Sequence, residues 1–145
     1  MKIAEVLRAK SSLVATIHPE QLVAAAVRDM KVHAVGALVV TRDQMHVDGI
    51  VSERDVVRAL ADDEAVLRRP VGDIMSTRFE ICSPADGITH AMELVTHRRQ
   101  RHVPVVDGGR LVGVVSVGDL VKARLEELEL ESQIMREASA ARLNR

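Results

Sequence analysis

Aromatic side chains are nearly absent from this chain of 145 residues, which holds one phenylalanine, Phe79, and neither tyrosine nor tryptophan. The core must therefore be built from aliphatic side chains and methionine. A chain of this length can bury about two-thirds of the surface that it exposes when unfolded. Proteins that bind single-stranded nucleic acid stack bases on several aromatic rings, so the shortage of rings argues against that function.

Cysteine and excess charge are scarce as well. Cys82 is the single cysteine, which excludes an internal disulfide and a metal site built from several cysteines, and fits a reducing compartment. The net charge of −1 supplies no global attraction to DNA or to an anionic membrane. No apolar run approaches 18 residues, and Glu5 interrupts the N-terminal segment, so neither a membrane span nor a signal peptide is expected. We expect a cytoplasmic protein.

The chain contains an internal repeat. Residues 17–30 align with residues 82–95, which places Pro19 on Pro84. Residues 49–55 (Gly-Ile-Val-Ser-Glu-Arg-Asp) align with residues 113–119 (Gly-Val-Val-Ser-Val-Gly-Asp). Two copies are too few for a solenoid. They predict two half-domains packed with pseudo-twofold symmetry.

Each copy has the pattern β-α-β-β-α. The expected strands cover residues 13–17, 37–40 and 46–51 in the first copy, and residues 79–82, 102–106 and 110–115 in the second. Helices are expected to begin at the two prolines, which favour a first helical turn, and at Ser52 and Ser116. We predict a first repeat at 6–62, a linker at 63–78 with a helical turn at 71–75, a second repeat at 79–128 and a C-terminal helical extension at 129–145.

The last helix is expected to run from about Ser116 nearly to Arg145, because no glycine or proline interrupts it after Gly118. Three interpretations stay open: a solvated helix laid over the module, a helix that packs against a second subunit or partner, and a frayed tail. Ser132 breaks the apolar stripe, so a long coiled coil is not expected.

The motif Gly-apolar-apolar-Ser-x-x-Asp occurs in both copies, where a strand leads into a helix. One interpretation is a capping box, in which Ser and Asp satisfy backbone N–H groups. The other is a nucleotide site, in which the helix N-terminus and the Ser hydroxyl bind phosphate and the Asp carboxylate accepts hydrogen bonds from a ribose diol. In that reading Gly49 and Gly113 give a ligand access to the backbone, and Arg54 supplies a bidentate phosphate contact.

The paired repeat with these motifs resembles the cystathionine β-synthase (CBS) domain pair, or Bateman module, over roughly residues 6–128. Residues 35–40, 101–106 and 73–76 match the same family. The resemblance implies an α/β fold of tandem β-α-β-β-α repeats, and an adenosine nucleotide such as AMP or ATP bound in clefts between them. It also implies a homodimer, and it leaves open a protein effector.

Carried onto this sequence, the resemblance places Ser52 and Ser116 at phosphate and Asp55 and Asp119 at ribose. The backbone that would line the base pockets belongs to Thr16, Ile17, Gly36, Ala37, Leu38, His102, Val103 and Pro104. Because no tyrosine or tryptophan is available, aliphatic side chains such as Ile17, Leu38 and Val103 are expected to enclose the base.

The two sites are expected to differ. Ile81 stands where the first copy has Thr16, and Gly118 stands where it has Arg54. We therefore expect the site with Asp55 and Arg54 to be the one filled if only one is filled.

The basic segment and the histidines give weaker indications of function. The basic segment 97–102 fits a helix C-terminus complemented by cations, and phosphate contact by Arg99 or Arg101, or nucleic-acid binding, are alternatives. The six histidines form no known metal motif, so neither a metal nor a cofactor is expected. The repeats use nearly the whole chain, and we expect no enzyme activity. The alternative to a nucleotide sensor is a structural dimerisation module whose two motifs only cap helices.

Overall fold

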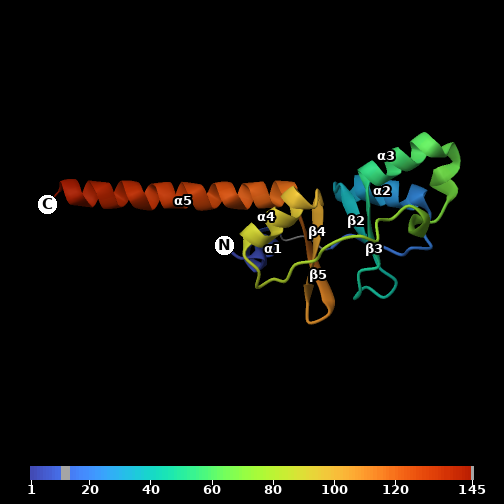
Figure 1. Cartoon of the computed structure of the whole chain (residues 1–145), viewed down its shortest axis with the longest axis horizontal. Coiled ribbons are helices and arrows are strands. Elements are labelled where there is room, and N and C mark those ends of the chain that lie inside the picture. Colours follow the sequence, from blue (N-terminus) through green and yellow to red (C-terminus); the bar gives the residue numbers. More distant parts are fainter. Residues whose placement is uncertain (11–13, 145) are drawn as a thin grey trace.

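The computed structural model describes residues 1–10 and 14–144. In the first half of the chain, β1 (Thr16–Ile17) pairs in parallel with β2 (Ala37–Val40), and β2 pairs antiparallel with β3 (Gly49–Ser52). Helices α2 (Val23–His33) and α3 (Glu53–Asp62) pack on these strands and on each other (Figure 1).

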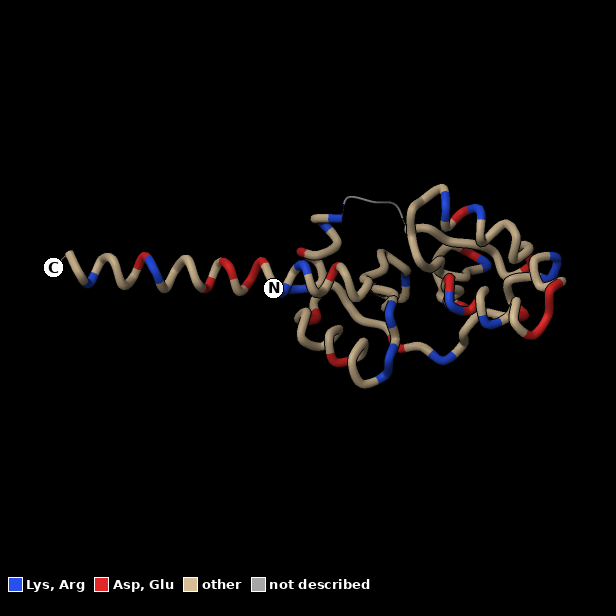
Figure 2. Tube along the Cα trace, turned by 90° about the horizontal axis from the view of Figure 1, so that it is seen from above, with Lys and Arg blue, Asp and Glu red and all other residues tan. Residues whose placement is uncertain are grey.

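The second half repeats this arrangement. Strands β4 (His102–Asp107) and β5 (Arg110–Ser116) form a hairpin whose turn residues, Gly108 and Gly109, both have positive φ. Asp-Gly between two apolar runs predicted this tight turn. Helices α4 (Ile88–His97) and α5 (Val117–Leu143) accompany the hairpin. The two halves lie side by side, and α5 leaves the second one (Figure 2). The expected α/β fold with a long C-terminal helix is confirmed.

An N-terminal helix that the sequence analysis did not anticipate crosses between the halves. Helix α1 (Ile3–Lys10) buries Ile3 and Val6 in the core of the second half. In return, the short 3₁₀ helices η1 (Glu64–Arg68) and η2 (Val71–Asp73) add Val66 and Val71 to the core of the first half. The core of the second half therefore includes the segment that precedes the first repeat. The core of the first half includes the segment that precedes the second repeat.

The hydrogen bonds of these two segments are related by the pseudo-twofold symmetry. Ile3 donates its N–H to the carbonyl of Asp86 (2.9 Å), as Val71 does to Gln21 (2.8 Å). Ala4 donates to the carbonyl of Pro84 (3.0 Å), as Gly72 does to Pro19 (2.8 Å). Residues 2–7 (Lys-Ile-Ala-Glu-Val-Leu) and 70–75 (Pro-Val-Gly-Asp-Ile-Met) are thus equivalent parts of the repeat.

The prediction of a strand at residues 79–82 is wrong. Only an isolated parallel bridge between Cys82 and Val105 remains of it. The side chain of Gln100 takes the place of a neighbouring strand, because its Oε1 accepts the N–H of Glu80 (2.7 Å) and its Nε2 donates to the carbonyl of Glu80 (2.8 Å).

The expected strand at 46–51 and the expected helix starts also need correction. Strand β3 begins only at Gly49, because the preceding loop satisfies its backbone locally: Asp43 Oδ1 accepts the N–H groups of Met45 and His46. Helices α2 and α4 begin four residues after Pro19 and Pro84, which lie in turns. Of the strand expected at 13–17, residues 16–17 form β1, and Leu13 lies outside the described residues.

Helix α5 spans 27 residues and confirms the long C-terminal helix, although Arg145 lies outside the described part of the chain. Within residues 1–10 and 14–144, no helix has the length and apolar composition needed to cross a membrane. The expected boundaries of the repeats, linker and extension stay predictions.

Candidate functional site

Both Ser-x-x-Asp motifs form complete capping boxes. Asp55 Oδ2 accepts the N–H of Ser52 (2.8 Å), and Ser52 Oγ accepts the N–H of Asp55 (3.2 Å). Asp119 and Ser116 make the same two bonds, at 2.8 and 3.2 Å. The capping interpretation is therefore correct for both motifs.

The first N–H of each of these helices donates to the residue that directly precedes the partner strand of the hairpin. The carbonyl of Arg101 accepts the N–H of Val117, and the carbonyl of Gly36 accepts the N–H of Glu53, each at 3.0 Å. Among the described residues, the N–H of Gly118 has no recorded acceptor. The N-terminus of α5 thus keeps one free donor, together with the positive end of the helix dipole.

A cavity of about 290 Å³ opens between the two halves beside this helix terminus. It is lined by residues 14–15 and 34–37 of the first half, by His102, residues 112–114, Ser116 and Asp119 of the second half, and by Leu7 and Lys10 of α1. Its walls are mostly aliphatic or backbone, while its polar groups are an imidazole, a hydroxyl, a carboxylate and an ammonium.

Lys10 forms an ion pair with the carboxylate of this cavity, that of Asp119. Its Nζ lies 2.8 Å from Asp119 Oδ2 and donates a second hydrogen bond to the carbonyl of Val114, also at 2.8 Å. The equivalent carbonyl in the first half, that of Ile50, instead accepts the backbone N–H of Ser76 (2.8 Å). The two halves therefore differ here, because α1 continues as a helix to Lys10.

The electrostatics of the cavity follow from this ion pair. Burial acts to raise the pKa of Asp119, but the bonds from Lys10 and from the N–H of Ser116 outweigh it and lower that pKa. Burial, reinforced by the charge of Lys10, lowers the pKa of His102 below its ordinary 6.5 against the pull of Asp119. At neutral pH the cavity thus holds an ion pair and a neutral imidazole.

The structure brings five of the predicted site residues together in this cavity: Gly36, Ala37, His102, Ser116 and Asp119. Other predicted residues lie elsewhere. Arg101 is exposed and lies immediately before β4.

Three predicted site residues of the first half, Ser52, Arg54 and Asp55, do not line this cavity. Arg54 is exposed on α3, and Ser52 Oγ donates to Asp55 Oδ2 (3.0 Å). Thr16 Oγ1 donates to Gln44 Oε1 (3.0 Å) in the loop after β2.

The expectation that aliphatic strand side chains enclose a base is wrong for this conformation. Ile17, Leu38 and Val103 are at most 2% exposed and belong to the two cores, and Pro104 is buried beside them. Inward-facing strand residues are needed for core packing, so they cannot also face a cleft.

The expectation that Gly49 and Gly113 make room for a ligand is also corrected. A Cβ on Gly113 would lie 2.5 Å from Leu7 Cδ2, and one on Gly49 would lie 2.7 Å from Met75 Sδ. Apolar side chains of the two equivalent preceding segments already fill the space above these glycines.

The sequence did not identify eight lining residues: Leu7, Lys10, Val14, Ala15, Ala34, Val35, Val112 and Val114. A signal was available for the first two. Residues 3–10 carry apolar side chains at helical spacing, and their likeness to residues 71–75 marks them as a part of the repeat.

In residues 1–10 and 14–144, no group of three or more His, Cys, Asp or Glu side chains lies close enough together to hold a metal ion.

Comparison with known proteins agrees with this architecture. The family model described as "CBS domain" matches residues 5–62 and 71–126. The mitochondrial CBS domain-containing protein CBSX3 of Arabidopsis thaliana is 37% identical over 113 residues, which is 74% of this chain and 55% of that protein. This chain therefore spans about half the length of that relative.

Solved structures extend the similarity to three dimensions. The CBS-domain protein ATU1752 of Agrobacterium tumefaciens is 37% identical, with a TM-score of 0.81 over 86% of this chain and 99% of that one. The CBS domain protein PAE2072 of Pyrobaculum aerophilum, solved in complex with AMP, is 29% identical, with a TM-score of 0.78 over 91% and 99%. With both repeats matched in sequence and in fold, the chain belongs to the CBS domain family and contains a pair of CBS domains.

Proposed function

We propose that this chain is a regulatory module that binds an adenosine nucleotide in the cavity beside Ser116 and Asp119 and has no catalytic activity of its own. The observation that carries the proposal is the cavity itself, where a helix N-terminus, a carboxylate and an ammonium surround about 290 Å³. That volume is near the lower end of the range for small-molecule sites. The relative solved with AMP supports the choice of ligand.

Each polar group has a part in this proposal. The carboxylate of Asp119 accepts hydrogen bonds from the ribose diol. The N–H of Gly118 and the hydroxyl of Ser116 face the phosphate at the positive end of α5. The neutral imidazole of His102, together with the backbone at Gly36, contacts the edge of the base.

Lys10 must change partners when the nucleotide binds. In the free protein its ammonium occupies Asp119, at 2.8 Å, and so competes with the ribose. A phosphate arriving at the N-terminus of α5 offers the ammonium a new anion nearby. Lys10 therefore opposes a nucleoside and assists a nucleotide, which selects for phosphorylated ligands.

The position of the cavity suggests how binding would be transmitted. Its walls come from both repeats, so a ligand that prefers one relative orientation of the repeats shifts the population toward it. A coupling of roughly 1–3 kcal/mol changes the affinity for a partner about 5–150-fold. Helix α5 begins at the cavity with Ser116 as its N-cap and extends beyond the body of the protein, so it is placed to report the shift (Figure 1).

The sequence ranked the half with Asp55 and Arg54 first, whereas the cavity at Asp119 leads us to propose the reverse order. Calorimetric titration with AMP tests this on Asp119→Ala and Asp55→Ala. Each variant removes the carboxylate of one capping box, at a cost of about 1 kcal/mol of helix stability, and Asp119→Ala also removes the ion pair with Lys10. We expect roughly a tenfold or greater loss of affinity for Asp119→Ala and little change for Asp55→Ala. A larger loss for Asp55→Ala would reject the choice of site.

The second candidate function is a structural dimerisation module. It is favoured by the completeness of both capping boxes, which already use the two carboxylates. Thermal unfolding with AMP, ADP, ATP, NAD and S-adenosylmethionine separates the candidates. A ligand at 100 times its dissociation constant stabilises a protein by about 2.7 kcal/mol, and no shift with any of the five would favour the second candidate.

A further inference from the structure

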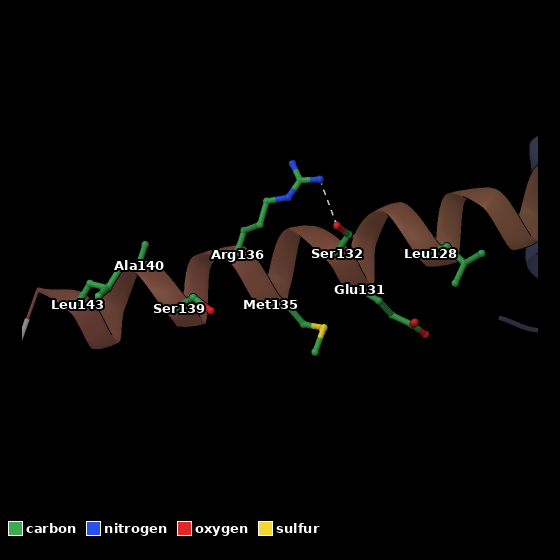
Figure 3. Close-up of a pocket in the computed structure, with 8 residues that line it drawn as sticks. All are labelled: Leu128, Glu131, Ser132, Met135, Arg136, Ser139, Ala140 and Leu143. Atoms are coloured by element: carbon green, nitrogen blue, oxygen red, sulfur yellow. Dashed lines mark hydrogen bonds between the residues drawn. The ribbon is translucent and has the colours of Figure 1, made fainter.

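Two hollows of the described chain differ in which parts of the protein line them. The shallow surface between Leu128 and Leu143 is lined by residues of α5 alone (Figure 3). The cavity of about 290 Å³ takes its walls from both repeats. A side chain that changes its charge in this cavity can therefore alter the contact between the repeats, whereas one on the outer part of α5 cannot.

His102 lies in this cavity at the boundary between the repeats. It is the first residue of β4 and pairs across the hairpin with Ser116, the N-cap of α5. Its ring also faces the first repeat, because the imidazole Nε2 lies 3.5 Å from the point that a Cβ on Gly36 would occupy. The side chain is half-buried. The charge of this imidazole therefore acts on both repeats.

Glu53 of the first repeat approaches the same point. Its Oε2 lies 3.9 Å from the Cβ position of Gly36. Its backbone N–H donates to the carbonyl of Gly36 (3.0 Å), which fixes the first residue of α3 beside the cavity. The Glu53 side chain is exposed, so its carboxylate can rotate toward the ring of His102. Because Gly36 has no Cβ, no side chain of that residue separates the carboxylate from the imidazole.

The pseudo-twofold symmetry does not repeat this arrangement. Ala37 of β2 corresponds to His102 of β4, since each pairs with the N-cap serine of the helix that follows. Val117 corresponds to Glu53, since they are the first residues of α5 and α3. Aliphatic side chains thus stand at the symmetry-related positions, so the imidazole and the carboxylate face each other on one side of the boundary.

Burial and four charged groups determine the pKa of His102. Burial has the largest effect and lowers this pKa below its ordinary 6.5. Lys10 of α1 and Arg101 before β4 lower it further, whereas Asp119 of α5 and Glu53 of α3 raise it. The other wall segments of the cavity carry no charged side chain: residues 14–15, 34–37 and 112–114. The imidazole is therefore neutral at neutral pH and takes up a proton when the pH falls.

We propose that His102 and Glu53 form a link between the two repeats that closes when the pH falls. The imidazole takes up a proton from the solvent, and its Nε2–H donates to the carboxylate of Glu53. The other nearby carboxylate, that of Asp119, is already paired with Lys10 at 2.8 Å, so Glu53 is the available partner. The link ties α3 of the first repeat to β4 of the second, and it needs no nucleotide.

The link has a regulatory consequence, which rests on the proposed function. There the nucleotide acts through the relative orientation of the repeats. A bond that forms between the repeats only when His102 is protonated favours one orientation over others. The pH then becomes a second input to the same conformational equilibrium.

NMR titration of the full chain without nucleotide tests the link. The Cε1–H signal of His102 is identified by its loss in His102→Gln, and the carboxyl carbon of Glu53 is followed in the same samples. We expect the Glu53 carboxyl signal to show a step at the midpoint of His102. In Glu53→Gln the midpoint of His102 should fall, because a negative charge that favours the imidazolium is lost. Glu64→Gln, an exposed change on η1, is the matched control and should leave that midpoint unchanged.

Urea unfolding measures the strength of the link. A double-mutant cycle of His102→Gln and Glu53→Gln cancels the contributions of the other histidines to the pH dependence. About one pH unit below the midpoint of His102, the interaction is expected to change the unfolding equilibrium constant about two- to fivefold, as for other partly exposed ion pairs. At pH 8 the imidazole is neutral, and this coupling should be absent.

Three results would overturn the proposal. An equal midpoint of His102 in the wild type and in Glu53→Gln would mean that the carboxylate does not act on the ring. A His102 that stays neutral until acid unfolds the protein would mean that the link never closes. A coupling as large at pH 8 as below the midpoint would mean that the contact does not depend on the proton. No nucleotide is present in these experiments, and the titration with AMP is separate, so failure of this proposal is distinguishable from failure of the proposed function.

Discussion

Replacing Lys10 with methionine is the sharpest perturbation of the proposed site. Methionine keeps most of the apolar stem but removes the ammonium that lies 2.8 Å from Asp119 Oδ2 and 2.8 Å from the carbonyl of Val114. Asp119 retains its bond to the N–H of Ser116, so the helix cap survives. The change therefore frees the carboxylate for a ribose diol and takes away a cation from the phosphate.

The two effects have opposite signs, and each can be estimated. The side chains of Lys10 and Asp119 are 31% and 21% exposed, so the pair is intermediate between a surface pair and a buried one. In the variant, adenosine can bind without breaking the Lys10–Asp119 ion pair. Its binding free energy is therefore expected to become more favourable by about 1.4 kcal/mol, which is tenfold in affinity. Losing a charge-assisted bond to phosphate costs about 1.5–3 kcal/mol, which is roughly 10–100-fold in the affinity for AMP.

Calorimetric titration of Lys10→Met with adenosine and with AMP measures both effects on one protein. We expect the preference for AMP over adenosine to fall roughly 100-fold or more, with adenosine bound more tightly than by the wild type. Lys31→Met, an exposed change on α2, is the control and should alter neither affinity. An unchanged preference, or weaker binding of both ligands, would refute the proposed exchange of partners by Lys10.

The same variant changes the pH dependence of stability. The pKa of Asp119 is lowered in the folded protein from its ordinary 3.8, so its ionisation contributes stability that is present above pH 3.8 and is lost as the pH falls through the folded value. Urea unfolding is expected to find Lys10→Met about 1–2 kcal/mol less stable than the wild type at pH 7. The difference between the two proteins should shrink as the pH falls below 3.8 through the lowered folded value, and a difference that stays constant over that range would contradict the role of Asp119.

Two further predictions concern packing. Gly49→Ala places a Cβ 2.9 Å from the carbonyl oxygen of Ser76, whereas Gly113→Ala meets only the flexible end of Leu7, so urea unfolding should find the first more destabilising, at roughly 2–3 against 1 kcal/mol. Equal losses would mean that the backbone yields as easily as a side chain. Burial raises the pKa of the Cys82 thiol to about 12, so a thiol reagent at pH 8 should modify it only as fast as the protein unfolds. Rapid modification of the folded protein would show that the core opens locally.

Predictions from sequence succeeded where the responsible contacts are local. The capping boxes at Ser52 and Ser116 depend on residues three positions apart, and the tight turn at Gly108 depends on neighbours. The strand expected at residues 79–82 failed because a side chain distant in sequence, that of Gln100, satisfies its backbone. The burial of Leu38 was likewise invisible, because β2 is a continuous apolar run whose sequence does not state which side chains face the core.

The sequence by itself determined the doubled architecture, the aliphatic core and the family, because repeats and spacing are properties of the chain alone. Only the tertiary structure showed that Asp119 lines a cavity between the two halves. Lys10 reaches the carbonyl of Val114 across 104 positions of sequence, since α1 packs on the second repeat and not on the first. Such a contact depends on the path of the whole chain, so the partner of Asp119 could be identified only after α1 was folded against the second half.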